Sequence, residues 1–170
     1  MDENSKADIT IRHLRVDDLN AIQALYAQQV DSDDNPLTRI DVNPKAHAWE
    51  MRRLRQQLMV EQRYLVFVAA ASEPAGERIV GYAGAILTEQ ARLFAVDMVA
   101  TVSELWVLPE YRHRGIGRAL VEELFTEIDN HGISWVTVQF PEKAAETRDF
   151  FKKLGFEQKT VEMQMCLEMA

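Results

Sequence analysis

The stretch Glu104–Ile128, ELWVLPEYRHRGIGRALVEELFTEI, joins a run that predicts a strand to a run that predicts a helix. Glycine weakens both kinds of element, so Gly115 and Gly117 at the junction indicate that the backbone needs an unobstructed approach there. Three cationic side chains surround the same point: Arg112, Arg114 and Arg118. The junction is therefore the part of the chain that indicates most about the fold and the ligand.

A helix that starts at this junction would have the properties of an anion site. The first N–H groups of a helix have no partner inside it, and they carry a partial positive charge. Without Cβ atoms at Gly115 and Gly117, a phosphate can approach those donors closely. The junction therefore predicts an anion site, suited to a pyrophosphate. The alternative is a simple glycine turn between strand and helix, with its arginines in solvent.

Two common phosphate-binding motifs fit these letters poorly. A P-loop needs Gly-Lys-Ser/Thr at the helix start, where this chain has Gly-Arg-Ala from Gly117. A dinucleotide fingerprint needs a third glycine where Leu120 stands, and an acid after the next strand, where Gln139 and Phe140 stand. The pattern therefore favours neither a P-loop nor a dinucleotide-binding turn.

Length and composition indicate one soluble globular domain over residues 1–170, with residues 1–8 as a loose N-terminus. The chain has 170 residues, of which 47% are hydrophobic and 27% charged. Its net charge of -8 argues against nucleic acid as a partner and favours a cationic or neutral small molecule. No apolar stretch approaches the roughly 20 residues that cross a bilayer. The polar, acidic start is unlike a secretion signal, so a cytoplasmic location is expected.

Metal and cysteine chemistry receive little support from the sequence. His13, His47 and His131 have no mutual spacing that suggests a metal site, so none is predicted. Cys166 is the single cysteine, which excludes an intramolecular disulfide. It lies in a predicted strand with no evident histidine partner, so we interpret it as a small packing residue rather than a nucleophile.

Hydrophobic periodicity predicts interleaved helices and strands, which are typical of a mixed α/β or α+β fold. The two strands that a short turn separates, 64–72 and 78–90, predict a hairpin. The other elements expected before the junction are a strand at 9–16, a helix that Asp17 or Asp18 caps, an acidic loop at 31–44, a helix at 45–62, and a strand at 93–108 with a turn or bulge near Asp97.

After the junction, Ile116, Leu120, Leu124 and Ile128 recur every four residues and predict an amphipathic helix that Gly132 ends. The remaining expected elements are a strand at 133–140, a helix at 142–156 with Gly155 as its stop signal, and a half-buried strand at 161–169.

The segment VLPEYRHRGIGRAL is similar to the acyl-CoA signature of the GNAT superfamily of N-acetyltransferases. Its core is Arg/Gln-x-x-Gly-x-Gly/Ala, here Arg112, Gly115 and Gly117. The later segment RDFFKKLGFEQ resembles the family's aromatic-pair segment, which ends here in Gly155-Phe156. The order of predicted elements follows the family's arrangement over nearly the whole chain.

The resemblance implies a strongly twisted mixed sheet of six to seven strands flanked by helices, with splayed central strands that form the CoA cleft. It also implies acetyl-CoA, or another acyl-CoA, as the donor. The pantetheine arm would bond along one exposed strand, a familiar recognition mode. The residues implied in donor binding are Leu105, Trp106, Val107, Arg112, His113, Arg114, Gly115, Ile116, Gly117, Arg118, Phe150, Phe151 and Lys153.

Acyl transfer to an amine requires a proton to leave the ammonium and one to reach the departing thiolate. The resemblance implies Glu104 as a base acting through water and the N–H of Val107 as the donor to the thioester oxygen. On a regular strand, Glu104 would share a face with Val102 and Trp106. The alternative for Glu104 is a strand-end carboxylate in solvent or paired with an arginine.

The acid is where the chain departs from the family's pattern. Similar proteins commonly have a tyrosine where Phe151 stands and an asparagine where Ala144 stands. The thiolate could leave unassisted, or Tyr111, Tyr82 or a water could replace the missing acid. The other hypothesis is a non-catalytic acyl-CoA-binding or sensing domain, although retained activity is favoured.

The acceptor is expected to be a primary amine of a small molecule or a peptide. In similar proteins the loop between the first two helices helps to form the acceptor pocket. Here the loop is acidic, which would attract an amine, although a solvated polar loop is an equal alternative. Its acidic residues are Asp31, Asp33, Asp34 and Asp41.

A homodimer is compatible with the resemblance.

Overall fold

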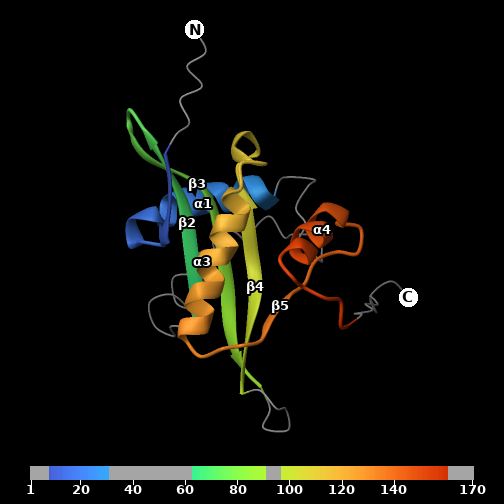
Figure 1. Cartoon of the computed structure of the whole chain (residues 1–170). Helices are drawn as coiled ribbons and strands as arrows, with labels where there is room; N and C mark the ends of the chain where they lie inside the picture. The colour runs from blue at the N-terminus through green and yellow to red at the C-terminus, as the bar shows by residue number, and fades with distance from the viewer. Residues whose placement is uncertain (1–7, 31–62, 91–96, 161–170) are drawn as a thin grey trace, which may run out of the picture.

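A computed structural model describes residues 8–30, 63–90 and 97–160 of the chain, and these form a five-stranded sheet with helices on both faces (Figure 1). The strand order is β1-β2-β3-β4-β5, with β1 to β4 antiparallel and β5 parallel to β4. The strands are β1 (Ile9–His13), β2 (Tyr64–Glu73), β3 (Gly76–Glu89), β4 (Met98–Val107) and β5 (Val136–Val138).

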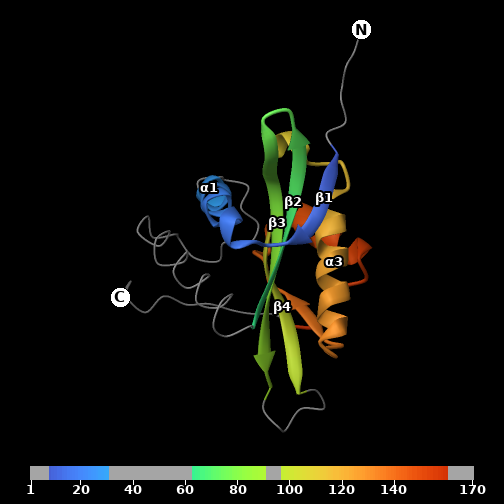
Figure 2. The same ribbon diagram turned by 90° about the vertical axis from the view of Figure 1, so that its left-hand side faces the viewer.

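The helix α3 (Ile116–Asn130) covers one face of the sheet, and α1 (Leu19–Val30) lies against the other (Figure 2). The four-residue repeat predicted for α3 is confirmed, because its apolar stripe is buried against the strands. Gly132 follows the helix with a φ of 72°, which a glycine adopts without strain, and this confirms it as the stop signal. The helix α4 (Ala145–Lys153) lies beside β5 and ends before Gly155, as predicted.

The helix α1 begins where the prediction placed it, directly after Asp18, although a turn precedes it. Residues Val16–Asp18 form this short 3-10 turn, η1, and the α-helix begins at Leu19. Asp18 does act near a helix start, but it accepts a hydrogen bond from the N–H of Arg15 (2.7 Å), which precedes the turn. The prediction was therefore right about where the helix begins, whereas the carboxylate of Asp18 bonds Arg15 and Arg12 instead of capping α1.

The hairpin of β2 and β3 and the following strand confirm the mixed fold, while the strand count is lower than predicted. Five strands lie within the described residues, against the six to seven implied. The strand expected at 133–140 pairs only over Val136–Val138. The helix expected at 45–62 and the strand expected at 161–169 lie outside the described residues. No helix of the described part is long and apolar enough to cross a membrane.

The strand β4 begins at Met98, after a bend at Asp97, which agrees with the turn expected near that residue. A second irregularity, which was not predicted, lies at Ser103 within β4. Gly84 pairs with Glu104 while Ala85 pairs with Val102, so Ser103 is an extra residue on β4. Neighbouring residues of β3 point to opposite faces, and so do their partners. The side chains of Val102 and Glu104 therefore lie on opposite faces, and the expectation that they share one is wrong.

Candidate functional site

The loop between β4 and α3 has the backbone conformation of a tight junction. Arg112 follows the short turn η3 (Pro109–Tyr111) with an extended backbone. His113 and Gly115 then adopt positive φ angles of 59° and 81°. Positive φ is costly for most residues and free for glycine, so Gly115 is required here by conformation.

The N-terminus of α3 keeps its first backbone donors available. Gly115 stands at the cap position and no side chain caps the helix. Ala119 N–H donates to the Gly115 carbonyl (3.0 Å) as the first helical bond. The N–H groups of Ile116, Gly117 and Arg118 precede it and have no partner within the helix. The first turn also contains no acidic residue, so the positive end of the helix dipole is not neutralised there.

The three arginines of the junction behave differently from one another. Arg112 donates from Nε to the Val107 carbonyl (2.9 Å). Arg114 donates to the Glu110 carbonyl (2.8 Å). Arg118 pairs with Glu122 one turn along α3, and its side chain is 61% exposed. Arg114 and Arg118 are both exposed, whereas Arg112 is partly buried, and Arg118 is the exposed arginine within the first turn of α3.

Three segments that are distant in sequence meet at Gly117. A Cβ atom placed on Gly117 would lie 3.9 Å from Val107 Cγ2 and 4.0 Å from Phe150 Cε2. The end of β4, the start of α3 and the side of α4 are therefore neighbours. The two motifs that the sequence analysis identified separately, around Gly117 and around Phe150, come together in the fold.

The edge of β4 that faces β5 is paired over only a short length. The two strands pair over Ala100–Val102, where Ala100 N–H donates to the Trp135 carbonyl (3.0 Å). Beyond that point β4 continues to Val107 with no described β5 residue opposite it. We call Ser103–Val107 on this side the open edge of β4.

The bulge decides which backbone groups face the open edge. Leu108 N–H donates to the Val80 carbonyl (2.9 Å), so the groups of Leu108 face β3. Backbone groups of successive residues in a strand point to alternate sides. The N–H and carbonyl groups of Leu105 and Val107 therefore face the open edge. At the other end of β4, Ala100 faces β5. In a strand without a bulge, strict alternation from Ala100 would turn the N–H and carbonyl groups of Leu105 and Val107 toward β3.

Glu104 and Trp106 lie on the face of the sheet that α1 covers. Tyr82, which pairs with Trp106, donates its hydroxyl to Gln29 on α1 (2.5 Å), and this fixes the face. Glu104 is two residues from Trp106 on the same side and is partly buried. Trp106 is 4% exposed, and its indole N–H has no hydrogen-bond partner within the described residues. Glu104 thus has an apolar neighbour, although not the Val102 that was expected.

The aromatic residues discussed for the general acid all have contacts within the fold, and none of these contacts supports a role as the acid. Phe151 is 1% exposed and packs against Phe140 and Phe156, so its ring belongs to the core. Tyr111 donates its hydroxyl to Glu73 on β2 (3.2 Å). Tyr82 donates to α1, as described above. Their roles stay predictions, while the packing explains why the aromatic pair is there.

Phe150 and Lys153 are the other residues of α4 implied in donor binding. Phe150 is half-buried and meets Phe151 edge-on, with 5.1 Å between ring centroids. Lys153 is exposed in the last turn of the helix, where a cation interacts favourably with the helix dipole. Phe150 thus lies next to the start of α3. The positive charge of Lys153 is explained by its place at the end of α4, without a bound donor.

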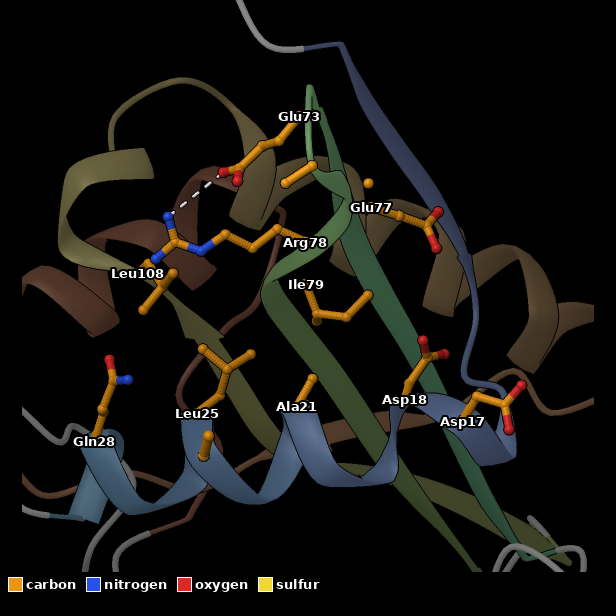
Figure 3. A pocket seen from close by; sticks show the side chains of 13 residues that line it. Asp17, Asp18, Ala21, Leu25, Gln28, Glu73, Glu77, Arg78, Ile79 and Leu108 are labelled. Atoms are coloured by element: carbon orange, nitrogen blue, oxygen red, sulfur yellow. Dashed lines mark ion pairs between the residues drawn. The ribbon is translucent and has the colours of Figure 1, made fainter.

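A cavity of about 440 Å³ lies between α1 and the β2–β3 hairpin, beyond the end of β4 (Figure 3). Its floor is apolar, from Leu25, Ile79 and Leu108, and its rim is largely acidic. Asp18 on that rim bonds Arg12 (2.7 and 2.9 Å), and Glu73 pairs with Arg78 (3.5 Å). These two carboxylates take part in ion pairs of the fold, and none of the residues predicted for donor binding or catalysis lines this cavity.

The ion pair of Arg12 and Asp18 extends to Glu77 at the tip of the hairpin (2.7 Å). The hydrogen bond from Arg12 holds the pKa of Asp18 below its ordinary value of 3.8, and the same donor lowers the pKa of Glu77. We call Arg12, Asp18 and Glu77 the β1 clasp. Sequence analysis did not find it, because its members are separated by up to 65 residues.

Two strand glycines beside the site were also missed. A Cβ atom on Gly81 would lie 2.8 Å from the Trp106 carbonyl oxygen, and one on Gly84 would lie 2.6 Å from the Tyr64 hydroxyl. Both glycines allow close contact next to β4, opposite Val107 and Glu104 respectively. An isolated glycine in a strand pattern is the signal that could have revealed them.

A protein-family comparison matches residues 62–158 to the GNAT acetyltransferase domain. The [ribosomal protein bS18]-alanine N-acetyltransferase of Escherichia coli K12 is 28% identical over 108 residues, which are 60% of this chain and 73% of that enzyme.

Solved structures share the fold over nearly the whole chain. A predicted acetyltransferase of Clostridium acetobutylicum with acetyl-CoA matches with a TM-score of 0.74 at 15% identity, over 96% of this chain and 99% of its own. The aminoglycoside acetyltransferase AAC(6')-Iy, in complex with a CoA bisubstrate analogue, matches with a TM-score of 0.69 at 18% identity, over 94% and 100%. At these identities the likeness establishes the fold.

Proposed function

The chain belongs to the GNAT acetyltransferase family, and from that membership we propose that it transfers an acetyl group from acetyl-CoA to a primary amine. The observation that carries the proposal is the open edge of β4 ending beside the uncapped start of α3. This arrangement offers an extended donor two sets of backbone partners in a row. We further propose that residues 1–170 act as one domain in the cytoplasm.

The pyrophosphate of the donor would bind at the start of α3. The N–H groups of Ile116, Gly117 and Arg118 supply donors, and the helix dipole favours the negative charge. The positive φ angles of His113 and Gly115 support this, because they turn the loop without placing a side chain over the amides. The exposed Arg118 adds positive charge at the same place.

The pantetheine arm would follow the open edge of β4. The N–H and carbonyl groups of Leu105 and the N–H of Val107 face that side, so an amide-containing chain can bond to them as an added strand would, while the Val107 carbonyl is bonded by Arg112. The thioester carbonyl would then receive a hydrogen bond from the N–H of Val107. Such a donor stabilises the negative charge that develops on the oxygen during attack.

The acceptor would approach from the face that carries Glu104. Water between Glu104 and the ammonium would carry its proton to the carboxylate, and the free amine would attack the thioester carbonyl carbon. A C–N bond forms, the C–S bond breaks, and the electron pair of that bond leaves with the CoA sulfur. The amine's second proton neutralises the thiolate, directly or through water.

Activity without a tyrosine at position 151 is chemically reasonable. A thiol has a pKa of about 8.5, so a thiolate is a tolerable leaving group near neutral pH. The buried Phe151 is nevertheless the observation that favours the second candidate, a domain that binds acyl-CoA without catalysis. Both candidates require donor binding, and only turnover separates them.

The acceptor class is proposed from chemistry and from relatives. The net charge of -8 favours a cationic amine. One relative acts on the alanine of a ribosomal protein, and one structural neighbour carries an acetylneamine analogue. We therefore propose a primary amine of a peptide or small molecule. The acidic loop expected to contribute, with Asp31 and its neighbours, lies outside the described residues.

Thiol release from acetyl-CoA across a panel of amines tests the proposed function. The panel would contain peptides with N-terminal alanine, aminoglycosides, amino sugars and simple diamines. We expect saturable release with at least one acceptor and formation of the acetylated amine by mass spectrometry. Saturable CoA binding without turnover on any amine would instead support the sensing domain.

A further inference from the structure

We propose that Arg112 is a positioning residue that holds the end of β4 in place for acyl transfer, rather than a ligand of the donor's phosphates. The inference rests on the donor site proposed above and deepens it. It starts from the direction of the side chain, which runs back from the loop to the end of β4.

The atom that Arg112 binds is a backbone group at the open edge of β4. Its Nε donates to the carbonyl oxygen of Val107 at 2.9 Å. The alternation established above places this carbonyl on the side that faces β5. No described β5 residue lies opposite it, since the pairing stops at Val102. Arg112 thus provides a bond that a neighbouring strand would otherwise provide.

The same side chain also contacts the face of the sheet that carries Glu104. The guanidinium carbon of Arg112 lies over the ring of Trp106, 4.5 Å from the ring centroid, which is a cation–π distance. Trp106 is buried and stands two residues from Glu104 on that face. Arg112 therefore holds both Val107, which is proposed to bind the thioester oxygen, and the ring next to the proposed base.

This arrangement leaves phosphate binding to other groups. Nε of Arg112 is used by a carbonyl, and its planar head is stacked on an indole. The backbone amides at the start of α3 and the exposed Arg118 have the positions that suit an external anion. Loss of Arg112 should therefore reduce the rate of transfer more than the affinity for the nucleotide part of the donor.

The length of the side chain provides a matched pair of variants. In glutamine, Nε2 stands at the same number of bonds from Cα as Nε in arginine, and it also donates a hydrogen bond. In methionine the equivalent atom is a methyl carbon. Arg112→Gln removes the charge and keeps the donor, whereas Arg112→Met removes both and keeps the bulk.

The test compares two donors for each variant. Acetyl-CoA carries the phosphates, whereas acetyl-pantetheine ends before them. For Arg112→Met we expect kcat to fall about tenfold with both donors, since a charge-assisted hydrogen bond is lost, while KM for acetyl-CoA stays within about twofold. For Arg112→Gln we expect rates within about threefold of wild type with both donors, because the bond to Val107 is retained.

Two other arginines calibrate the measurement. Arg118→Gln should raise KM for acetyl-CoA and leave acetyl-pantetheine unaffected, as expected of a residue near the phosphates. Arg63→Gln removes an exposed arginine that pairs with Glu89, far from the site, and should change neither donor. If Arg112→Met does not fold, Arg112→Gln alone decides, because a phosphate ligand could not lose its charge without a higher KM for acetyl-CoA.

The proposal is overturned if either Arg112 variant raises KM for acetyl-CoA alone while transfer from acetyl-pantetheine is normal. It is also overturned if glutamine is no better than methionine in a folded protein. A wild-type chain that transfers from neither donor to any amine contradicts the proposed function itself, and the inference with it. A defect in the variants against an active wild type concerns Arg112 only.

Discussion

The direction of the Glu104 side chain depends on the pairing of its strand. Its backbone pairs with β3, opposite a glycine, and its side chain lies on the face that α1 covers. A regular strand would have placed it with Val102, in the core under α3. One extra residue, Ser103, turns the carboxylate to the side from which we propose that the acceptor approaches. The candidate base therefore depends on a bulge as much as on its own chemistry.

We expect Glu104→Gln to lower kcat about a hundredfold at acidic to neutral pH, where an amine most needs a base, and less at alkaline pH. Affinity for CoA should be nearly unchanged, because the donor contacts are backbone groups. Steady-state rates between pH 6 and 10 would show this. Glu89→Gln, on the exposed end of β3, serves as the matched control. An unchanged pH–rate profile would remove Glu104 from the mechanism.

At the scale of elements, the important relation is between the start of α3 and the strand end before it. The loop is short, so its two positive φ angles and its two glycines set how closely strand and helix approach. Gly115 is needed for its conformation, whereas position 117 needs only a side chain small enough to leave the amides open. The two requirements can be separated experimentally, because alanine meets one of them and not the other.

Gly117→Ala should raise the free energy of unfolding by about 0.5 kcal/mol, since alanine is the better helix former and its Cβ would meet only ordinary contacts. It should retain CoA-induced thermal stabilisation, whereas Gly117→Trp should abolish it by covering the amides. Gly115→Ala, at a φ of 81°, should instead destabilise by about 1 kcal/mol. Thermal shift assays with and without CoA would measure all three. Full stabilisation of the tryptophan variant by CoA would disprove this placement of the site.

At the scale of the whole molecule, the β1 clasp joins the first strand, the start of α1 and the tip of the hairpin. Arg12 and Asp18 are largely buried, with side chains 12% and 10% exposed, whereas Glu77 is 44% exposed and contributes less because solvent screens it. Since the folded pKa of Asp18 is lowered, the stability it contributes is present above pH 3.8 and is lost as pH falls through the folded value.

Arg12→Met should therefore lower the free energy of unfolding by about 1–3 kcal/mol at pH 7 and flatten its decline in acid. Urea unfolding between pH 7 and 3 would give both quantities. Arg63→Met, which removes an exposed pair with Glu89, should cost less than about 1 kcal/mol and leave the acid decline unchanged. Parallel pH curves for wild type and Arg12→Met would show that the clasp is not the origin of the decline.

Much of the fold could be predicted from local patterns. The stripe of α3 and its stop at Gly132 were evident from spacing and glycine chemistry, and so was the hairpin. The start of α1 after Asp18 was also predicted, whereas the bonds of Asp18 to Arg12 and Arg15 were not, because a helix-start pattern does not contain Arg12. The short β5 was over-predicted because apolar residues continue beyond the point where pairing stops.

Residues that are near neighbours along the chain sufficed to predict most of the elements and the family, because these depend on local patterns. The directions of the side chains depend instead on how the strands and the loop pack together. The bulge at Ser103 turned Glu104 away from Val102, and the side chain of Arg112 returns to the Val107 carbonyl, the contact on which its proposed role rests. Both outcomes depend on backbone hydrogen bonds between distant segments. A bulge is defined by the pairing of two strands, so the sequence of β4 without that of its partner β3 does not reveal the bulge at Ser103.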